Sequence, residues 1–123
     1  MNFATCLNCI DGRTQFSVMS WIISNYGYEF VDLITEPGIA AKLAHDECTA
    51  SCIADKARLS LACHESGHIF IAGHHDCAAY DGDDRRHQID LGIALKRVRL
   101  LFPQIQVTGL WVNEHSEVEE VNI

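Results

Sequence analysis

The chain has 123 residues, 48% of them hydrophobic, and a formal net charge of -8 at pH 7. This length suffices for one substantial core and is too short for two ordinary domains, so we expect a single domain over residues 1–123. The acidic charge argues against nucleic acid as a partner. The lack of a long apolar run or a secretory signal argues against a membrane and for a cytoplasmic protein.

The first predicted elements are a short strand, a helix and a second strand. Residues 2–10 favour a buried strand, and the segment CIDGR at its end indicates an Asp-Gly turn. Residues 29–35 favour the second strand. The helix between them, over residues 15–25, is predicted from apolar residues at helical spacing, namely Phe16, Met19, Ile22 and Ile23.

The middle of the chain is rich in alanine. Residues 39–66 have high helix propensity, which predicts one long helix or two helices broken near Thr49. Residues 68–73 then favour a third strand, which leads into the segment GHHDC.

The last third of the chain alternates again between helix and strand. After the acidic loop YDGDD, Asp83 or Asp84 is the candidate N-cap of a helix that Pro103 ends. The predicted apolar face of this helix consists of Leu91, Leu95, Val98 and Phe102. Residues 104–112 favour a fourth strand, and residues 116–123 favour an antiparallel edge strand formed by a hairpin.

Strands separated by helices indicate parallel βαβ units with right-handed crossovers. We therefore predict an α/β fold, a three-layer sandwich around a mainly parallel sheet. The predicted strand order is 2-1-3-4, with the antiparallel strand as a possible addition at the edge.

The carboxyl ends of the first and third strands carry side chains that could bind a metal. In this strand order the two strands are neighbours whose connections leave toward opposite faces, so their ends form the crevice where ligands bind. Cys9 ends the first strand, and His74 and Cys77 end the third. Two thiolates and an imidazole suit zinc, and three protein ligands leave a fourth tetrahedral position open. The sequence therefore predicts a zinc site.

Asp11 and Arg13 lie on the turn directly after Cys9, close to the predicted metal. A carboxylate that a bidentate Arg holds stays ionised and is kept from becoming the fourth ligand. Together, CIDGR and GHHDC match the pattern Cys-x-Asp-x-Arg followed by Gly-His-x-x-Cys, in which the chain resembles the β-class carbonic anhydrases. The resemblance extends to the Ala-rich helix and to the closing pair of strands.

This resemblance implies a reaction and roles for the residues. It implies zinc held by Cys9, His74 and Cys77, with Asp11 and Arg13 beside the zinc-bound water, and reversible hydration of carbon dioxide to bicarbonate. Two thiolate ligands should weaken the acidification of that water, so we expect better activity at alkaline pH. A water chain or a nearby histidine, His75 or His87 by position, would export the proton.

The chain also departs from the familiar pattern. It starts directly at the first strand, without the helical arm that enzymes of the family use to embrace a partner, and Ala78 and Ala79 stand where the family favours glycine. It thus resembles a minimal branch of the family. An exposed edge at the second strand favours a homodimer or higher homo-oligomer through a sheet edge or a helix face.

Other readings stay open at this point. The same scaffold could carry zinc without catalysis, or could hydrolyse a CO2-like molecule such as carbonyl sulfide or carbon disulfide. Cys6 and Cys9 form a CxxC, which raises a redox dithiol or a closed Cys3His site as alternatives. Residues three apart on an extended strand lie about 10 Å apart on opposite faces, so we expect Cys6 to be buried between sheet and helix.

A second metal site is a weaker alternative. Its candidate ligands are His45, Cys48, Cys52, Cys63 and His64. No matching opposite half is evident, so we expect core packing or a helix terminus for these residues. The DGDD run lacks the spacing of a calcium loop and indicates a solvated loop with an N-cap.

Overall fold

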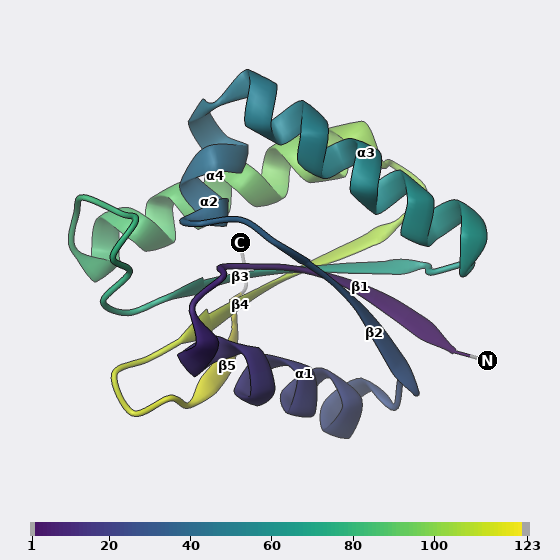
Figure 1. Ribbon diagram of the computed structural model, residues 1–123, viewed down its shortest axis with the longest axis horizontal. Helices are drawn as coiled ribbons and strands as arrows, with labels where there is room; N and C mark the ends of the chain where they lie inside the picture. Colours follow the sequence, from purple (N-terminus) through teal and green to yellow (C-terminus); the bar gives the residue numbers. More distant parts are fainter. Residues whose placement is uncertain (1, 122–123) are drawn as a thin grey trace.

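The computed structural model describes residues 2–121, which form a five-stranded sheet with helices on both faces (Figure 1). The strand order is β2-β1-β3-β4-β5, with every neighbouring pair parallel except β4 and β5. The predicted α/β sandwich, its order 2-1-3-4 and the antiparallel edge strand are therefore confirmed. The elements are β1 (Phe3–Asn8), α1 (Gly12–Tyr26), β2 (Phe30–Thr35), α2 (Ile39–His45), α3 (Glu47–Cys63), β3 (His68–His74), α4 (Asp84–Leu101), β4 (Gln106–Val112) and β5 (Val118–Val121).

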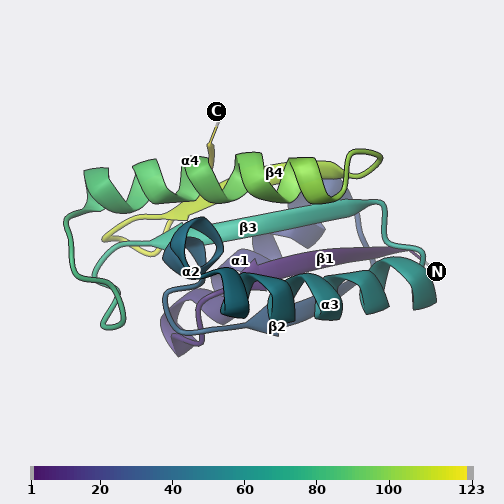
Figure 2. The same cartoon turned by 90° about the horizontal axis from the view of Figure 1, so that it is seen from above.

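The two faces of the sheet are covered unequally. Figure 1 shows α2, α3 and α4 above the sheet and α1 below it, and Figure 2 shows the two long upper helices, α3 and α4, running along the direction of the strands. The larger core packs under the three helices, around Leu7, Ile71 and Leu95. The smaller core lies against α1, around Val18 and Phe70. None of the described helices is long and apolar enough to span a bilayer.

β1 and β3 lie side by side at the centre of the sheet. Leu7 stands opposite Ile71 in a parallel register. Because the strands run in the same direction, Cys9, which directly follows β1, and His74, which ends β3, lie at the same edge of the sheet. The topology thus brings the two motifs together although they are far apart in the sequence.

The first helix differs from its prediction. It begins at Gly12 rather than near residue 15, because the side chain of Asp11 caps it by accepting the backbone N–H of Arg13 at 2.9 Å. CIDGR is therefore a junction between strand and helix rather than a free turn. The predicted apolar face was wrong for Phe16 and Ile23, which are 80% and 43% exposed. The buried stripe of α1 runs instead along Thr14, Val18 and Ile22.

The Ala-rich stretch forms two helices, α2 and α3, which confirms the predicted alternative of a broken helix over one long helix. The break lies at Asp46, three residues before Thr49, because the Asp46 side chain accepts the Thr49 N–H at 3.1 Å and caps α3. Of the two candidate caps of α4, Asp83 caps the helix through the Arg86 N–H. The predicted apolar face of α4 is buried, although Phe102 lies just past the helix end.

The closing strands are shorter than predicted. β4 begins at Gln106 because residues 103–105 form a turn closed by the Ile105 N–H on the Phe102 carbonyl. β5 ends the described part of the chain, and the last two residues of the predicted strand, 122–123, lie outside the described residues.

Candidate metal centre

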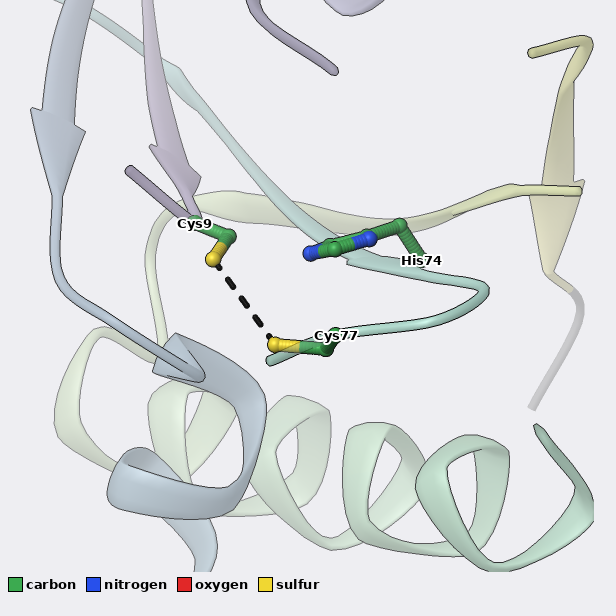
Figure 3. A group of neighbouring side chains, drawn as sticks. All are labelled: Cys9, His74 and Cys77. Atoms are coloured by element: carbon green, nitrogen blue, oxygen red, sulfur yellow. Dashed lines mark hydrogen bonds between the residues drawn. The ribbon is translucent and has the colours of Figure 1, made fainter. Parts of the chain in front are cut away.

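Cys9, His74 and Cys77 converge at the carboxyl edge of the sheet, and all three are buried (Figure 3). Their candidate ligand atoms all lie within 4.8 Å of one another, and the two sulfur atoms are 3.9 Å apart. Two sulfurs bound at about 2.3 Å to one tetrahedral zinc would be separated by about 3.8 Å. The spacing of the two thiols therefore fits zinc.

The ring of His74 is oriented toward the two cysteines by its own backbone. Its Nδ1 lies 2.8 Å from the carbonyl oxygen of His75, and a carbonyl can only accept, so Nδ1 carries the proton. Nε2 then holds the free lone pair, and this buried atom has no hydrogen-bond partner among the residues the structure describes. An orphaned buried acceptor beside two thiols is the chemistry of a metal ligand.

The thiol of Cys9 is acidified. Burial alone raises its pKa, but the neighbouring His74 and the backbone N–H groups of Gly38 and Asp11 outweigh burial and bring it to about 7. The pKa of Cys77 is raised, first by burial and then by the charge of Cys9. Cys9 is thus the more acidic of the two thiols, and a bound cation would favour the thiolate form of both.

Polar side chains of the β1–α1 junction fix the position of Cys9. Asn8 is fully buried, and its Oδ1 accepts the Cys9 N–H at 2.8 Å and the Thr14 hydroxyl at 3.3 Å. Gln15 donates its amide to the Cys9 carbonyl at 2.6 Å. The roles of Asn8 and Gln15 were not predicted from the sequence. The one feature that could have indicated them is a polar residue, Asn8, directly before Cys9 in a strand that is otherwise apolar at its end.

Arg13 joins the two motifs. Its guanidinium holds both oxygens of Asp11, with Nη2 at 2.7 Å from Oδ2 and Nε at 3.1 Å from Oδ1. The same side chain donates to the Asp76 carbonyl at 3.0 Å and to its carboxylate at 3.4 Å. Asp76, which lies within the second motif, adopts a left-handed backbone conformation with φ of 56°.

The ion pair determines the charge of Asp11. The hydrogen bond from Arg13 lowers the pKa of Asp11 to about 2, so this carboxyl is ionised at any physiological pH. The predicted bidentate pair is present in the structure. Arg13 occupies both carboxylate oxygens, which favours Asp11 as a neighbour of the metal rather than as its ligand.

A small cavity of about 50 Å³ opens beside His74. It lies between the start of α1, at Arg13 and Thr14, and the end of β4 at Val112. His75 also borders this cavity. This volume is comparable to that of one or two water molecules, which is the scale of a triatomic substrate.

The two predicted proton carriers differ in environment. His87 is buried, stacks on Tyr80 at 4.1 Å, and has a pKa lowered to about 4 by burial, so it stays neutral near neutral pH. His75 is half-exposed and its Nδ1 lies 2.8 Å from an oxygen of Asp84. With Asp84 and Glu114 it forms a second, more exposed group of ligand-type side chains at the rim.

The remaining cysteines lie apart from the centre. Cys6 is fully buried against α1, as predicted, and burial raises its pKa to about 12. Cys48, Cys52 and Cys63 are exposed, so the core-packing alternative was wrong for them. The helix-terminus alternative is confirmed for His45, which ends α2, and for Cys63 and His64 at the end of α3. His45 bonds Asp90 instead of joining them, and these residues form no metal-type group in the described chain. The DGDD residues form the predicted loop and cap.

Comparison with solved structures identifies the class of fold. The chain superposes on the β-carbonic anhydrase CcaA with a TM-score of 0.63 at 12% identity, covering 99% of this chain and 81% of that one. A tetrameric β-carbonic anhydrase of the ascomycete Sordaria macrospora gives a TM-score of 0.57 at 11% identity, covering 100% of this chain and 82% of that one. A mutant of the β-carbonic anhydrase CafD of Aspergillus fumigatus gives a TM-score of 0.57 at 10% identity, covering 97% of this chain and 89% of that one. At these identities the likeness establishes the β-carbonic anhydrase fold.

The sequence itself places the chain more narrowly. The family model described as "Putative carbonic anhydrase" matches residues 1–122. The chain belongs to this family. A search of curated proteins finds no match.

Proposed function

We propose that the protein binds one zinc ion through Cys9, His74 and Cys77 and catalyses the reversible hydration of carbon dioxide to bicarbonate. The observation that supports this most is the buried Nε2 of His74, which has no hydrogen-bond partner within residues 2–121 and faces two thiols whose sulfur atoms are 3.9 Å apart. Membership in the family supports the choice of reaction. When bound in such a site, zinc acts as a Lewis acid that makes water nucleophilic near neutral pH.

Asp11 is proposed to orient the reacting water. An ionised carboxylate can only accept hydrogen bonds, and the pKa of Asp11 is about 2 because Arg13 binds it. By accepting one O–H of the water, Asp11 would direct an oxygen lone pair toward the carbon of the substrate. Arg13 acts by keeping this acceptor charged and in place.

His75 is the better proposed route for the proton. It borders the cavity beside His74 and reaches solvent, and Asp84 fixes its ring. The burial that lowers the pKa of His87 to about 4 removes that side chain as a carrier near neutral pH. We assign proton export to His75 and water.

We further propose a cytoplasmic homo-oligomer. Thiol ligands stay reduced and available to zinc in a reducing compartment. One of the structural neighbours is described as tetrameric. Several large apolar side chains of this chain are also exposed, which supports a partner surface.

The proposal is tested by metal analysis of untagged protein and stopped-flow hydration of CO2 at alkaline pH. We expect about one zinc per chain. Asp11→Asn keeps a residue able to cap α1 but removes the charge, and should lower the hydration rate about 100-fold without releasing zinc. Asp83→Asn makes the same exchange at the cap of α4 and should leave the rate unchanged.

Two results would contradict the proposal. If the purified protein contains no zinc and takes up none, the proposed zinc site is wrong. Zinc-loaded protein without hydration above the buffer rate would remove the reaction, and assays with carbonyl sulfide and carbon disulfide would then separate a related hydrolase from a zinc protein without catalysis.

A further inference from the structure

Tyr80 anchors the loop that carries Cys77. The loop joins β3 to α4, and the Tyr80 N–H donates to the Cys77 carbonyl at 3.1 Å, which closes a turn directly after the candidate ligand. The Tyr80 hydroxyl donates to Oδ2 of Asp90 at 2.6 Å. The loop is thus bonded to α4 through one side chain three residues from the sulfur.

The acceptor of this bond is itself held. Asp90 is only 9% exposed, and its other oxygen, Oδ1, lies 2.8 Å from Nε2 of His45 at the end of α2. A buried carboxylate with a hydrogen bond on each oxygen has little freedom to turn. The Tyr80–Asp90–His45 chain, called here the tether, therefore links the loop to two helices.

The ring of Tyr80 is also fixed. It stacks on the imidazole of His87 with ring centroids 4.1 Å apart and an interplanar angle of 16°. His87 in turn meets the edge of Trp111 on β4, with centroids 5.2 Å apart. Ring and hydroxyl are thus held by different partners, so the hydroxyl can be removed while the ring contacts stay.

The opposite side of the loop closely approaches the residue before α2. A Cβ built on Gly38, the residue before α2, would come within 3.0 Å of the Ala79 carbonyl oxygen. The loop therefore lies between the N-terminus of α2 and α4, and the tether sets how closely it approaches them.

We propose that Tyr80 is a positioning residue for zinc binding, whose tether to Asp90 and His45 holds Cys77 at its distance from Cys9 and His74 before the metal arrives. The inference rests on the proposed zinc site and concerns how this chain prepares it. A site that is already ordered binds without the entropic cost of ordering a ligand loop. Groups that orient metal ligands commonly change metal affinity by 10–100-fold when they are removed.

The decisive variant is Tyr80→Phe, which deletes one hydroxyl and keeps the ring stacked on His87. We expect its zinc dissociation constant, measured by competition with a chromophoric chelator, to rise about 10-fold. In the cobalt-substituted protein, we expect the thiolate-to-metal charge-transfer band to shift or weaken, because Cys77 is held less firmly. A purely structural tyrosine would leave this band unchanged.

Tyr28→Phe is the matched control. The hydroxyl of Tyr28 bonds Nδ1 of His68 at 2.9 Å, so the exchange also removes one hydrogen bond of a tyrosine hydroxyl, but at the start of β3, whereas His74 ends that strand. It should lower the stability of the metal-free protein to a similar degree and leave zinc affinity and the cobalt spectrum as in the wild type.

Three outcomes would overturn the inference. The first is wild-type zinc affinity and cobalt spectrum in Tyr80→Phe. The second is an equal loss of affinity in Tyr80→Phe and Tyr28→Phe, which would indicate general destabilisation. The third is a wild-type chain that binds no zinc, which removes the proposed function as well. A wild-type chain that binds zinc but does not hydrate CO2 removes the proposed reaction alone, and the comparison of the two variants still decides on the tether.

Discussion

Three buried histidines, His68, His74 and His87, show how the surroundings of a side chain assign its role. Both ring nitrogens of His68 have partners, with Nδ1 2.9 Å from the Tyr28 hydroxyl and Nε2 2.8 Å from the Thr108 hydroxyl. A ring that is satisfied on both sides is structural. His74 differs by one atom, since its Nε2 has no partner among the described residues, and that single difference marks it as the candidate ligand.

Burial of His68 predicts a loss of stability in acid. Burial lowers the pKa of this ring from 6.5 to about 4, so between these values the unfolded chain binds a proton that the folded chain excludes. The free energy of unfolding should therefore be highest above pH 6.5 and fall as the pH drops toward 4. We expect the ring resonances of His68 to titrate with a midpoint near pH 4 in NMR spectra.

A substitution separates this histidine from the others. His68→Gln should flatten the dependence of the unfolding free energy on pH between 6.5 and about 4, measured by urea denaturation, whereas His115→Gln, at an exposed site, should not. His87 adds a second contribution of the same sign, so some dependence will persist. An unchanged slope in His68→Gln would contradict the assignment.

At the scale of elements, the packing of β3 against β4 depends on a residue without a side chain. A Cβ built on Gly73 would lie 3.0 Å from the ring of Trp111, which is buried and also contacts His87. We predict that Gly73→Ala lowers the free energy of unfolding by about 1–3 kcal/mol, because an added methyl in a filled core forces its neighbours to shift. Urea denaturation of the metal-free protein measures this directly.

Gly67 offers the control for that exchange. It lies just before the same strand, and no atom of the described part of the chain would approach an added Cβ within 4 Å. Gly67→Ala should change the free energy of unfolding by less than about 0.5 kcal/mol. Equal effects of the two substitutions would show that the Trp111 ring yields freely.

The order of elements, the strand order and the convergence of the two motifs could all be predicted, because hydrophobic periodicity and the crossover rule are local or general. The start of α1 could not, since the cap that fixes it uses Asp11, a residue interpreted as part of a turn. The supporting roles of Asn8, Asp76 and Tyr80 were also hidden. Their partners lie on other segments, and polar pairing across a fold leaves no periodic trace in the sequence.

For the whole molecule, the exposed apolar side chains bear on self-association. Phe16 and Ile23 lie seven residues apart on α1, which places them on one outer stripe, and Ile10 is exposed at the foot of that helix beside Asp11. We predict that Phe16→Glu weakens self-association, measured by sedimentation velocity. Leu100→Glu, which alters a similarly exposed side chain on α4 across the sheet, should have no such effect. A wild-type chain that sediments as a monomer would contradict the proposed oligomer.

The guanidinium of Arg13, bonded to Asp11 on its own turn and to Asp76 on the other, also limits how the centre can change. Arg13 thus links the segment after β1 to the segment after β3. Adding one residue to either segment would break a hydrogen bond to the other. Anyone moving this centre to a different scaffold would have to transplant both turns together, at the spacing of neighbouring parallel strands. The hydrogen bonds of Arg13, more than the three candidate ligands, therefore define the smallest segment pair that could be transferred as a working site.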